Sequence, residues 1–106
     1  MRAHLRIAGL VMAAAVITMP LAAQNSGAEI YKSKCQSCHG ATGMADSGAG
    51  KALKVKPANS PEVKKMNEAQ MIDAVRNGMG KMQPYKGKLT DAEIKGSVEF
   101  FRTFVK

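Results

Sequence analysis

The pattern of apolar positions near the end of the chain indicates an amphipathic helix. Four apolar residues recur at intervals of four, three and four positions: Ile94, Val98, Phe101 and Val105. Such spacing places them on one face of a helix. The preceding segment 90–93, Thr-Asp-Ala-Glu, is a capping box, whose first and fourth side chains pair with free backbone N–H groups at a helix start. We therefore expect the last helix to begin just after Thr90.

Similar signals predict helices in the preceding part of the chain. Cap residues, a proline and glycine stops define a brief turn over residues 60–65 and helices over residues 26–37, 50–53 and 67–77. Asn25 or Ser26 can cap the first of them, and Asn67 the last. No convincing strand and no internal repeat is visible. The expected fold class is therefore all-α, with three to four short helices joined by glycine-rich loops.

The first residues of the chain follow a different pattern. A short basic start precedes an apolar run over residues 7–17, and small residues follow up to Ala23. That order is typical of a secretory signal, and the apolar stretch is shorter than the ~20 residues that a membrane span requires. We expect residues 1–23 to be a signal peptide for export to the periplasm, and residues 24–106 to form one domain. An uncleaved membrane anchor is the alternative.

The composition of the expected mature chain suggests that its core is incomplete. Two of the 16 Lys and Arg residues lie in the signal, so 14 remain against 8 Asp and Glu. Large core formers are scarce, with 13 Leu, Ile, Val and Phe residues in residues 24–106. So small a share is typical of disordered chains, and a small domain usually needs additional stabilisation. Because the helix signals argue against disorder, we infer that an apolar cofactor completes the core.

The segment 35–39, Cys-Gln-Ser-Cys-His, matches the attachment signature of c-type haem. Residues three positions apart lie on one helical face, so Cys35 and Cys38 can form thioether bonds with the two vinyl groups of one porphyrin. His39 then lies under the ring, where its nitrogen can ligate the iron. The expected cofactor is one haem c, covalently bound through Cys35 and Cys38.

Three other interpretations of this segment are weaker. A disulfide between Cys35 and Cys38 would close too short a loop to stabilise the chain much. A thioredoxin-like redox pair would require a βαβ pattern around it. A zinc site needs about four ligands, whereas His4 lies in the expected signal and His39 is then the remaining histidine.

The second axial ligand of the iron is expected to be a methionine, since the mature chain has no second histidine. The methionines available are Met44, Met66, Met71, Met79 and Met82. Met44 is too close to His39 in sequence to reach the other face of the ring. Met66 lies at the start of the third helix and Met71 within it, where methionine is usually core filling. Met79 and Met82 lie in a loop between helices. We favour Met82, which Pro84 and Tyr85 follow, and Met79 is the alternative.

With these residues in place, the chain resembles the small monohaem class I cytochromes c of bacteria and photosynthetic electron chains. The likeness covers essentially the whole mature domain and rests on Gly27, Tyr31, Cys35, Cys38, His39, Gly40, Met71-Ile72, Asn77-Gly78, Met82, Pro84-Tyr85, Leu89-Thr90, Ile94, Gly96 and Phe100. The resemblance implies a cytochrome c fold in which the first and last helices cross at Gly27 and Gly96, with Tyr31 and Phe100 beside the contact. The family usually has proline directly after the ligand methionine, whereas Gln83 stands there in this chain.

A haem with His39 and Met82 as axial ligands suits electron transfer rather than catalysis, because both ligand positions are filled by the protein. We therefore expect a monomeric periplasmic electron carrier that is not an enzyme. Lysines near the ligands predict docking onto acidic redox partners, such as membrane oxidase or dehydrogenase complexes: Lys32, Lys34, Lys51, Lys81, Lys86 and Lys88. Nucleic acid is a poor match, since the chain has no aromatic-basic platform. The alternatives are a dedicated haem subunit of a periplasmic dehydrogenase or terminal oxidase, and a haem protein that binds small ligands.

Overall fold

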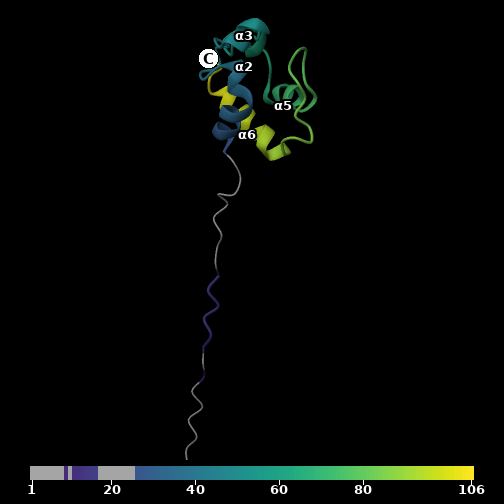
Figure 1. The fold of residues 1–106 in the computed structure, drawn as a ribbon. Coiled ribbons are helices and arrows are strands. Elements are labelled where there is room, and N and C mark those ends of the chain that lie inside the picture. Colours follow the sequence, from purple (N-terminus) through teal and green to yellow (C-terminus); the bar gives the residue numbers. More distant parts are fainter. Residues whose placement is uncertain (1–8, 10, 17–25) are drawn as a thin grey trace, which may run out of the picture.

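The structure, a computed structural model, describes residues 9, 11–16 and 26–106. The expected signal peptide therefore lies largely outside the described residues, and so does its cleavage site at Ala23. Residues 9 and 11–16 form no helix or strand. Within the described part of the chain, no helix has the length and apolar character needed to cross a membrane. The folded domain, residues 26–106, is drawn in Figure 1.

The domain begins with one continuous helical segment made of three parts. These are α1 (Gly27–Ile30), a π-helical turn, η1 (Tyr31–Cys35), and α2 (Gln36–His39). Ser26 is the cap: its hydroxyl accepts a hydrogen bond from the backbone N–H of Glu29 at 3.2 Å, and the Glu29 carboxylate accepts one from the Ser26 N–H at 3.3 Å. The first expected helix is confirmed, and it runs two residues beyond Ser37. Nothing in the sequence pattern had indicated the π-helical turn.

Three of the remaining helices follow at the expected places, and one short helix lies where a brief turn was expected. They are α3 (Gly48–Ala52), α4 (Pro61–Lys64), α5 (Glu68–Asn77) and α6 (Asp91–Arg102). Their caps are local side-chain contacts from Ser47, Ser60, Asn67 and Thr90. In residues 26–106 the β-structure consists of two isolated bridges, Met79 with Met82 and Lys86 with Leu89. The fold is all-α, as the sequence predicts.

The N-terminal helix crosses α6 where the two backbones come unusually close. A Cβ atom at Gly27 would overlap the carbonyl oxygen of Gly96, so no other residue fits there. Beside this contact the rings of Tyr31 and Phe100 lie 5.2 Å apart between centroids, within the range of favourable aromatic pairs. The crossing of the first and last helices at these four residues is confirmed. It fixes the N-terminal helix against α6, and with it the position of the segment 35–39 that continues this helix.

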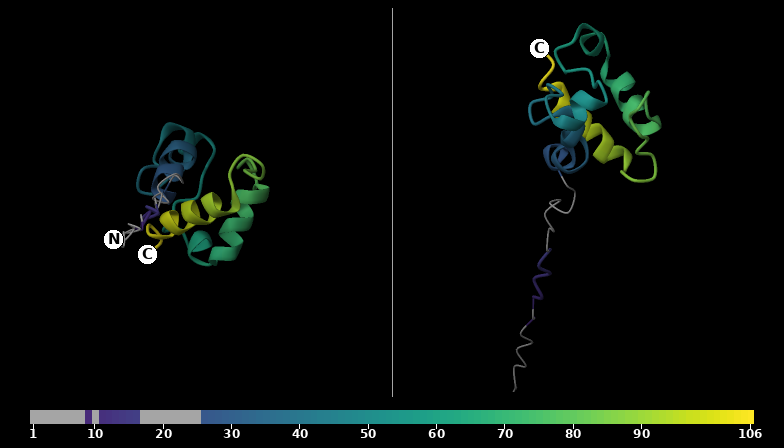
Figure 2. Two further views of the ribbon diagram at one scale, coloured as in Figure 1. Left: turned by 90° about the horizontal axis from the view of Figure 1, so that it is seen from below. Right: turned by 45° about the horizontal axis from the view of Figure 1, so that its top comes forward.

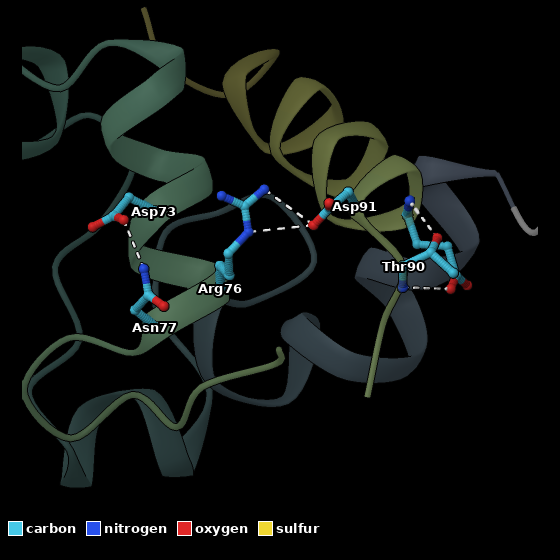
Figure 3. Close-up of polar contacts among 6 residues, drawn as sticks. Asp73, Arg76, Asn77, Thr90 and Asp91 are labelled. Carbon is cyan, nitrogen blue, oxygen red and sulfur yellow. Dashed lines mark hydrogen bonds and ion pairs between the residues drawn. The ribbon is translucent and has the colours of Figure 1, made fainter. Parts of the chain in front are cut away.

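Helix α6 also packs against α5, and Figure 2 shows it running between the N-terminal helix and α5. An ion pair joins α5 and α6 at each end. Arg76, in the last turn of α5, contacts the Asp91 carboxylate at 3.1 Å, as Figure 3 shows. Arg102, at the end of α6, contacts Glu68 at 3.2 Å. Each charge also lies at the helix end that it stabilises.

The buried core of the domain is small. The main cluster consists of Val63, Met71 and Val98, with partly buried neighbours around it. Several other buried positions are alanines, and the large fully buried side chains are Tyr31 and Ile94. Instead of more apolar side chains, the centre of the domain contains a cavity. This arrangement agrees with the shortage of large core residues in the sequence.

Candidate functional site

The central cavity has a volume of about 810 Å³ and is lined mainly by apolar side chains. That volume lies within the range of about 300–1,000 Å³ that is typical of ligand and cofactor pockets. Every predicted site residue lines it: Cys35, Cys38 and His39 from the N-terminal helical segment, and Met82 from the loop between α5 and α6. Segments more than forty positions apart in sequence therefore meet around one space. Val98 and Phe101 of α6 form part of the apolar wall.

The two cysteines are free thiols in half-buried positions. Burial, and to a smaller extent the neighbouring Cys38, raises the pKa of the Cys35 thiol to about 11. At neutral pH Cys35 is therefore protonated. A reactive thiolate in a redox-active Cys-x-x-Cys pair has a depressed pKa instead, so the environment does not suit a thioredoxin-like site. Both thiols face an apolar space, where they can be alkylated by a cofactor.

His39 lies against the same space, with its ring 5.4 Å from that of Phe101 in an edge-on arrangement. Burial lowers the pKa of His39 below its usual value, so the imidazole is neutral at pH 7, which is the form that ligates metals. Its Nδ1 atom is buried and has no hydrogen-bond partner among the described residues. A half-buried histidine with a buried, unpaired nitrogen beside a large cavity fits a metal-ligating role better than a structural one.

The chemistry of these donors fits haem and does not fit a protein-only metal site. The described residues contain no group of three or more His, Cys, Asp or Glu side chains placed to hold a metal ion. Two thiols, one neutral imidazole and a thioether around an apolar cavity are the groups that a covalently attached haem requires. The residues present therefore fit the cofactor that the sequence predicts.

The loop between α5 and α6 brings two methionines to the cavity. Met79 and Met82 exchange backbone hydrogen bonds, with Met79 N–H donating to Met82 at 3.2 Å and Met82 N–H donating to Met79 at 2.9 Å. Met82 is half-buried, whereas 58% of Met79 is exposed. Of the other methionines, Met66 and Met71 line the cavity from the α5 side, and Met44 does not line it.

Two residues of this loop have a role that the sequence did not reveal. The Tyr85 hydroxyl donates a hydrogen bond to the backbone carbonyl of Lys34 at 3.0 Å, next to Cys35. Gln83, which stands where the resembling family has proline, donates from its amide to the Tyr85 oxygen at 3.3 Å and accepts from the Lys88 ammonium at 3.1 Å. The one signal available in the sequence was the departure at Gln83. These bonds hold the segment around Met82 in place of the proline ring.

The rim of the cavity is basic and partly apolar. Four lysines line it, Lys34, Lys54, Lys56 and Lys81, against one carboxylate, Glu62, which lies 3.6 Å from the Lys56 ammonium. Lys34 and Lys81 were predicted from sequence to lie near the site. Lys32, Lys51, Lys86 and Lys88 do not line the cavity, and Lys54 and Lys56 were missed because they follow α3, away from both ligand segments in sequence. Leu53, 40% exposed, and Met79 add apolar surface at the same rim.

The helical fold and a cavity that gathers these ligands define a class of protein, the small c-type cytochromes. The comparisons with known proteins agree. The chain of a solved structure described as "KustC0563 c-type cytochrome" is 30% identical, with a TM-score of 0.70 over 77% of this chain and 100% of that chain. A tyrosine-to-phenylalanine variant described as Kustc0563 is 28% identical, with a TM-score of 0.67 over 76% and 99% of the two chains. No curated protein sequence matches.

Residues 22–101 match the family described as "Cytochrome C oxidase, cbb3-type, subunit III". The match covers most of the chain, so the chain belongs to this cytochrome c family. Membership implies covalently bound haem c and a role as a haem-based electron carrier.

Proposed function

We propose that the protein is an exported carrier of single electrons, in which Cys35 and Cys38 attach one haem c and His39 and Met82 ligate its iron. One observation carries this proposal: the four side chains come from two separate segments and line a single apolar cavity of about 810 Å³. Haem iron supplies the one-electron chemistry. The protein's own residues attach the group, exclude water from it and keep both axial positions filled.

Each ligand contributes a defined property. The neutral imidazole of His39 is ready to coordinate without losing a proton. The thioether of Met82 is uncharged, and His/Met ligation raises the reduction potential relative to anionic ligands. Because the same two ligands serve the oxidised and reduced states, electron exchange requires little rearrangement. An electron carrier needs axial ligands that stay bound in both redox states, whereas an enzyme that binds its substrate at the iron needs one axial position open.

The proposal includes export to the periplasm after removal of residues 1–23, and action as a monomer. The basic start, apolar run and small residues of that segment support export. Partners are expected to be acidic redox proteins. Four lysines and one glutamate, Glu62, line the cavity, which leaves a net positive charge there, while Leu53 and Met79 offer exposed apolar contact at the same rim.

A second candidate is a dedicated haem subunit of a terminal oxidase or dehydrogenase complex. The description of the matching family as an oxidase subunit favours it. Co-purification from native membranes separates the two candidates. A subunit remains with one complex through washing at high salt, whereas a freely diffusing carrier is released, because its contacts are mainly electrostatic.

Covalent attachment of the haem is tested by denaturing the mature protein in acid-acetone and measuring the mass of the polypeptide by mass spectrometry. We expect the colour to stay with the protein and the mass of one haem to be added to the chain that begins at Gln24. Single variants Cys35→Ser and Cys38→Ser should each lose one thioether bond. The matched control is Ser37→Ala, which changes a variable position of the same segment and should leave attachment intact. Haem that extracts freely from the unaltered protein would refute the proposal.

A further inference from the structure

Met79 and Met82 present their side chains to the same side of the ligand loop. The two residues form an isolated antiparallel bridge and exchange both of its backbone hydrogen bonds, at 3.2 and 2.9 Å. In such a pair the Cα atoms lie about 5.5 Å apart and the side chains of opposite residues share one face. Both side chains accordingly line the central cavity. Two thioethers are therefore available to one site.

The two methionines are held differently. Met82 is half-buried, and the hydrogen bonds of Gln83 and Tyr85 stabilise the backbone that follows it. Met79 is 58% exposed. It stands between Gly78 and Gly80, both of which have positive φ angles, of 80° and 58°. A Cβ atom at Gly80 would meet nothing within 4 Å, so this side of the loop has space to move.

Packing alone does not account for the position of Met79. A large apolar side chain that is more than half exposed contributes little to the core. Met79 also lines a shallow outer depression on α5 of about 490 Å³, together with Met66 and Asp73. Its side chain thus lies at the wall between the cavity and solvent. Because Met79 borders both spaces, rotation about its own side-chain bonds can carry the thioether between the outer depression and the cavity.

We propose that Met79 is a reserve distal ligand, which takes the iron position whenever Met82 leaves it. The inference rests on the proposed function, in which Met82 is the resident ligand. Met79 then keeps the iron closed to external molecules, so that a carrier whose resident ligand dissociates does not become a ligand-binding haem protein. The reserve competes directly with any small molecule for the open position.

The test uses leucine variants, which remove the sulfur and nearly keep the volume. The readouts are the weak far-red band of sulfur bound to ferric haem and the affinity of the reduced protein for carbon monoxide. We expect Met79→Leu to leave both unchanged. Met82→Leu should keep a shifted sulfur band, because Met79 binds. If Met79 occupies the iron about nine tenths of the time, Met82→Leu should bind carbon monoxide about tenfold more weakly than the Met79→Leu, Met82→Leu double variant.

A matched control distinguishes the reserve from a general effect on the cavity. Met66 also lines the cavity, so Met66→Leu combined with Met82→Leu should behave as Met82→Leu alone. If Met82→Leu shows the same spectrum and the same carbon monoxide affinity as the Met79→Leu, Met82→Leu double variant, the reserve role is refuted and Met82 remains the ligand. If Met79→Leu loses the band while Met82→Leu keeps the wild-type spectrum, the ligand assignment itself is wrong. Loss of the band in both single variants also overturns the reserve role.

Discussion

The hydroxyl of Tyr85 donates a hydrogen bond to the backbone carbonyl of Lys34, at 3.0 Å and across 51 positions of sequence. Lys34 directly precedes Cys35, and Tyr85 follows Met82 by three residues. The bond therefore connects the segment that attaches the haem with the loop that supplies the proposed distal ligand. Because the Tyr85 backbone N–H also donates to Val75 at 2.9 Å, the same residue fixes the loop to α5.

Tyr85→Phe should weaken distal ligation while leaving the fold intact. The substitution keeps the ring and removes both hydrogen bonds of the hydroxyl, to Lys34 and from Gln83, each of which contributes about 1 kcal/mol. We expect the sulfur–iron band to disappear at a lower denaturant concentration than in the unaltered protein, and imidazole to enter the site more readily. The band and the helical circular dichroism, followed in one urea titration, separate loss of the ligand from unfolding.

Tyr31→Phe is the matched control, because it also removes a tyrosine hydroxyl. This hydroxyl bonds to Gly40, which follows the attachment segment, whereas that of Tyr85 bonds to Lys34, which precedes it. The Tyr31 hydroxyl donates to the Gly40 carbonyl at 2.5 Å in a buried position, and burial raises the pKa of Tyr31 to about 12. Its loss should lower the free energy of global unfolding, so that band and helix are lost together. If Tyr85→Phe also lost both signals together, Tyr85 would have no special connection with the ligand loop.

The two glycines of the helix crossing should respond differently to alanine. A Cβ at Gly27 would overlap the Gly96 carbonyl, so Gly27→Ala must push the helices apart, at a cost of about 1–3 kcal/mol. At Gly96 a Cβ would lie 3.5 Å from the Gly27 Cα, an ordinary contact. Gly96→Ala also gains up to about 1 kcal/mol of helix propensity. Urea unfolding of the two variants measures the difference, and greater destabilisation by Gly96→Ala would contradict the crossing geometry.

The helix starts could be predicted because capping is local chemistry. Ser60, Asn67 and Thr90 each accept a hydrogen bond from a backbone N–H three residues further along, which a short stretch of sequence encodes. The attachment motif is equally local. The space available for a Cβ atom, by contrast, differs between Gly27 and Gly96. This difference depends on how two helices from opposite ends of the chain approach each other, and nothing in the sequence distinguishes the two glycines.

Residues that act across the fold were the ones that sequence reasoning missed. Lys86 and Lys88 stand close to Met82 in sequence, yet neither lines the cavity. Lys54 and Lys56 do, because the chain after α3 turns back to the rim, with Lys54 itself at a positive φ of 54°. The Tyr85–Lys34 bond also joins distant segments. Where these residues lie in space depends on how distant segments pack together, and a single sequence does not reveal that packing.

Electron transfer to an acidic partner should depend on which lysine is reversed. Lys81 and Lys54 lie at the cavity rim, whereas Lys64 is exposed on α4 and does not line the cavity. Lys81→Glu and Lys54→Glu should therefore slow association more than Lys64→Glu, although all three change the net charge equally. Stopped-flow rates should also fall as the Debye length shrinks from ~30 Å at 0.01 M to ~10 Å at 0.1 M salt. Equal effects of all three variants would mean that net charge alone directs association.

Folding of the domain should require the attached haem. The protein places an apolar cavity of about 810 Å³ where a domain of this size would have its core, and 13 large aliphatic and phenylalanine residues are too few to close it. Without the porphyrin the cavity walls would face water, so the hydrophobic gain that offsets chain entropy would be lost. The Cys35→Ser, Cys38→Ser double variant, prepared free of haem, should therefore lack most of its helical circular dichroism and show no cooperative thermal transition.

The control for this experiment alters the same helical turn without removing a thiol. Gln36→Ala combined with Ser37→Ala changes the two variable positions of the attachment segment and should leave both attachment and helicity intact. The haem-free cysteine variant retains every helix cap, including Ser26, Asn67 and Thr90. Isolated helices of 12 residues or fewer are marginal in water even when capped, so these caps cannot replace the missing core. A native-like helical spectrum with a cooperative transition in the haem-free variant would show that the protein core is sufficient and that the cavity is preformed.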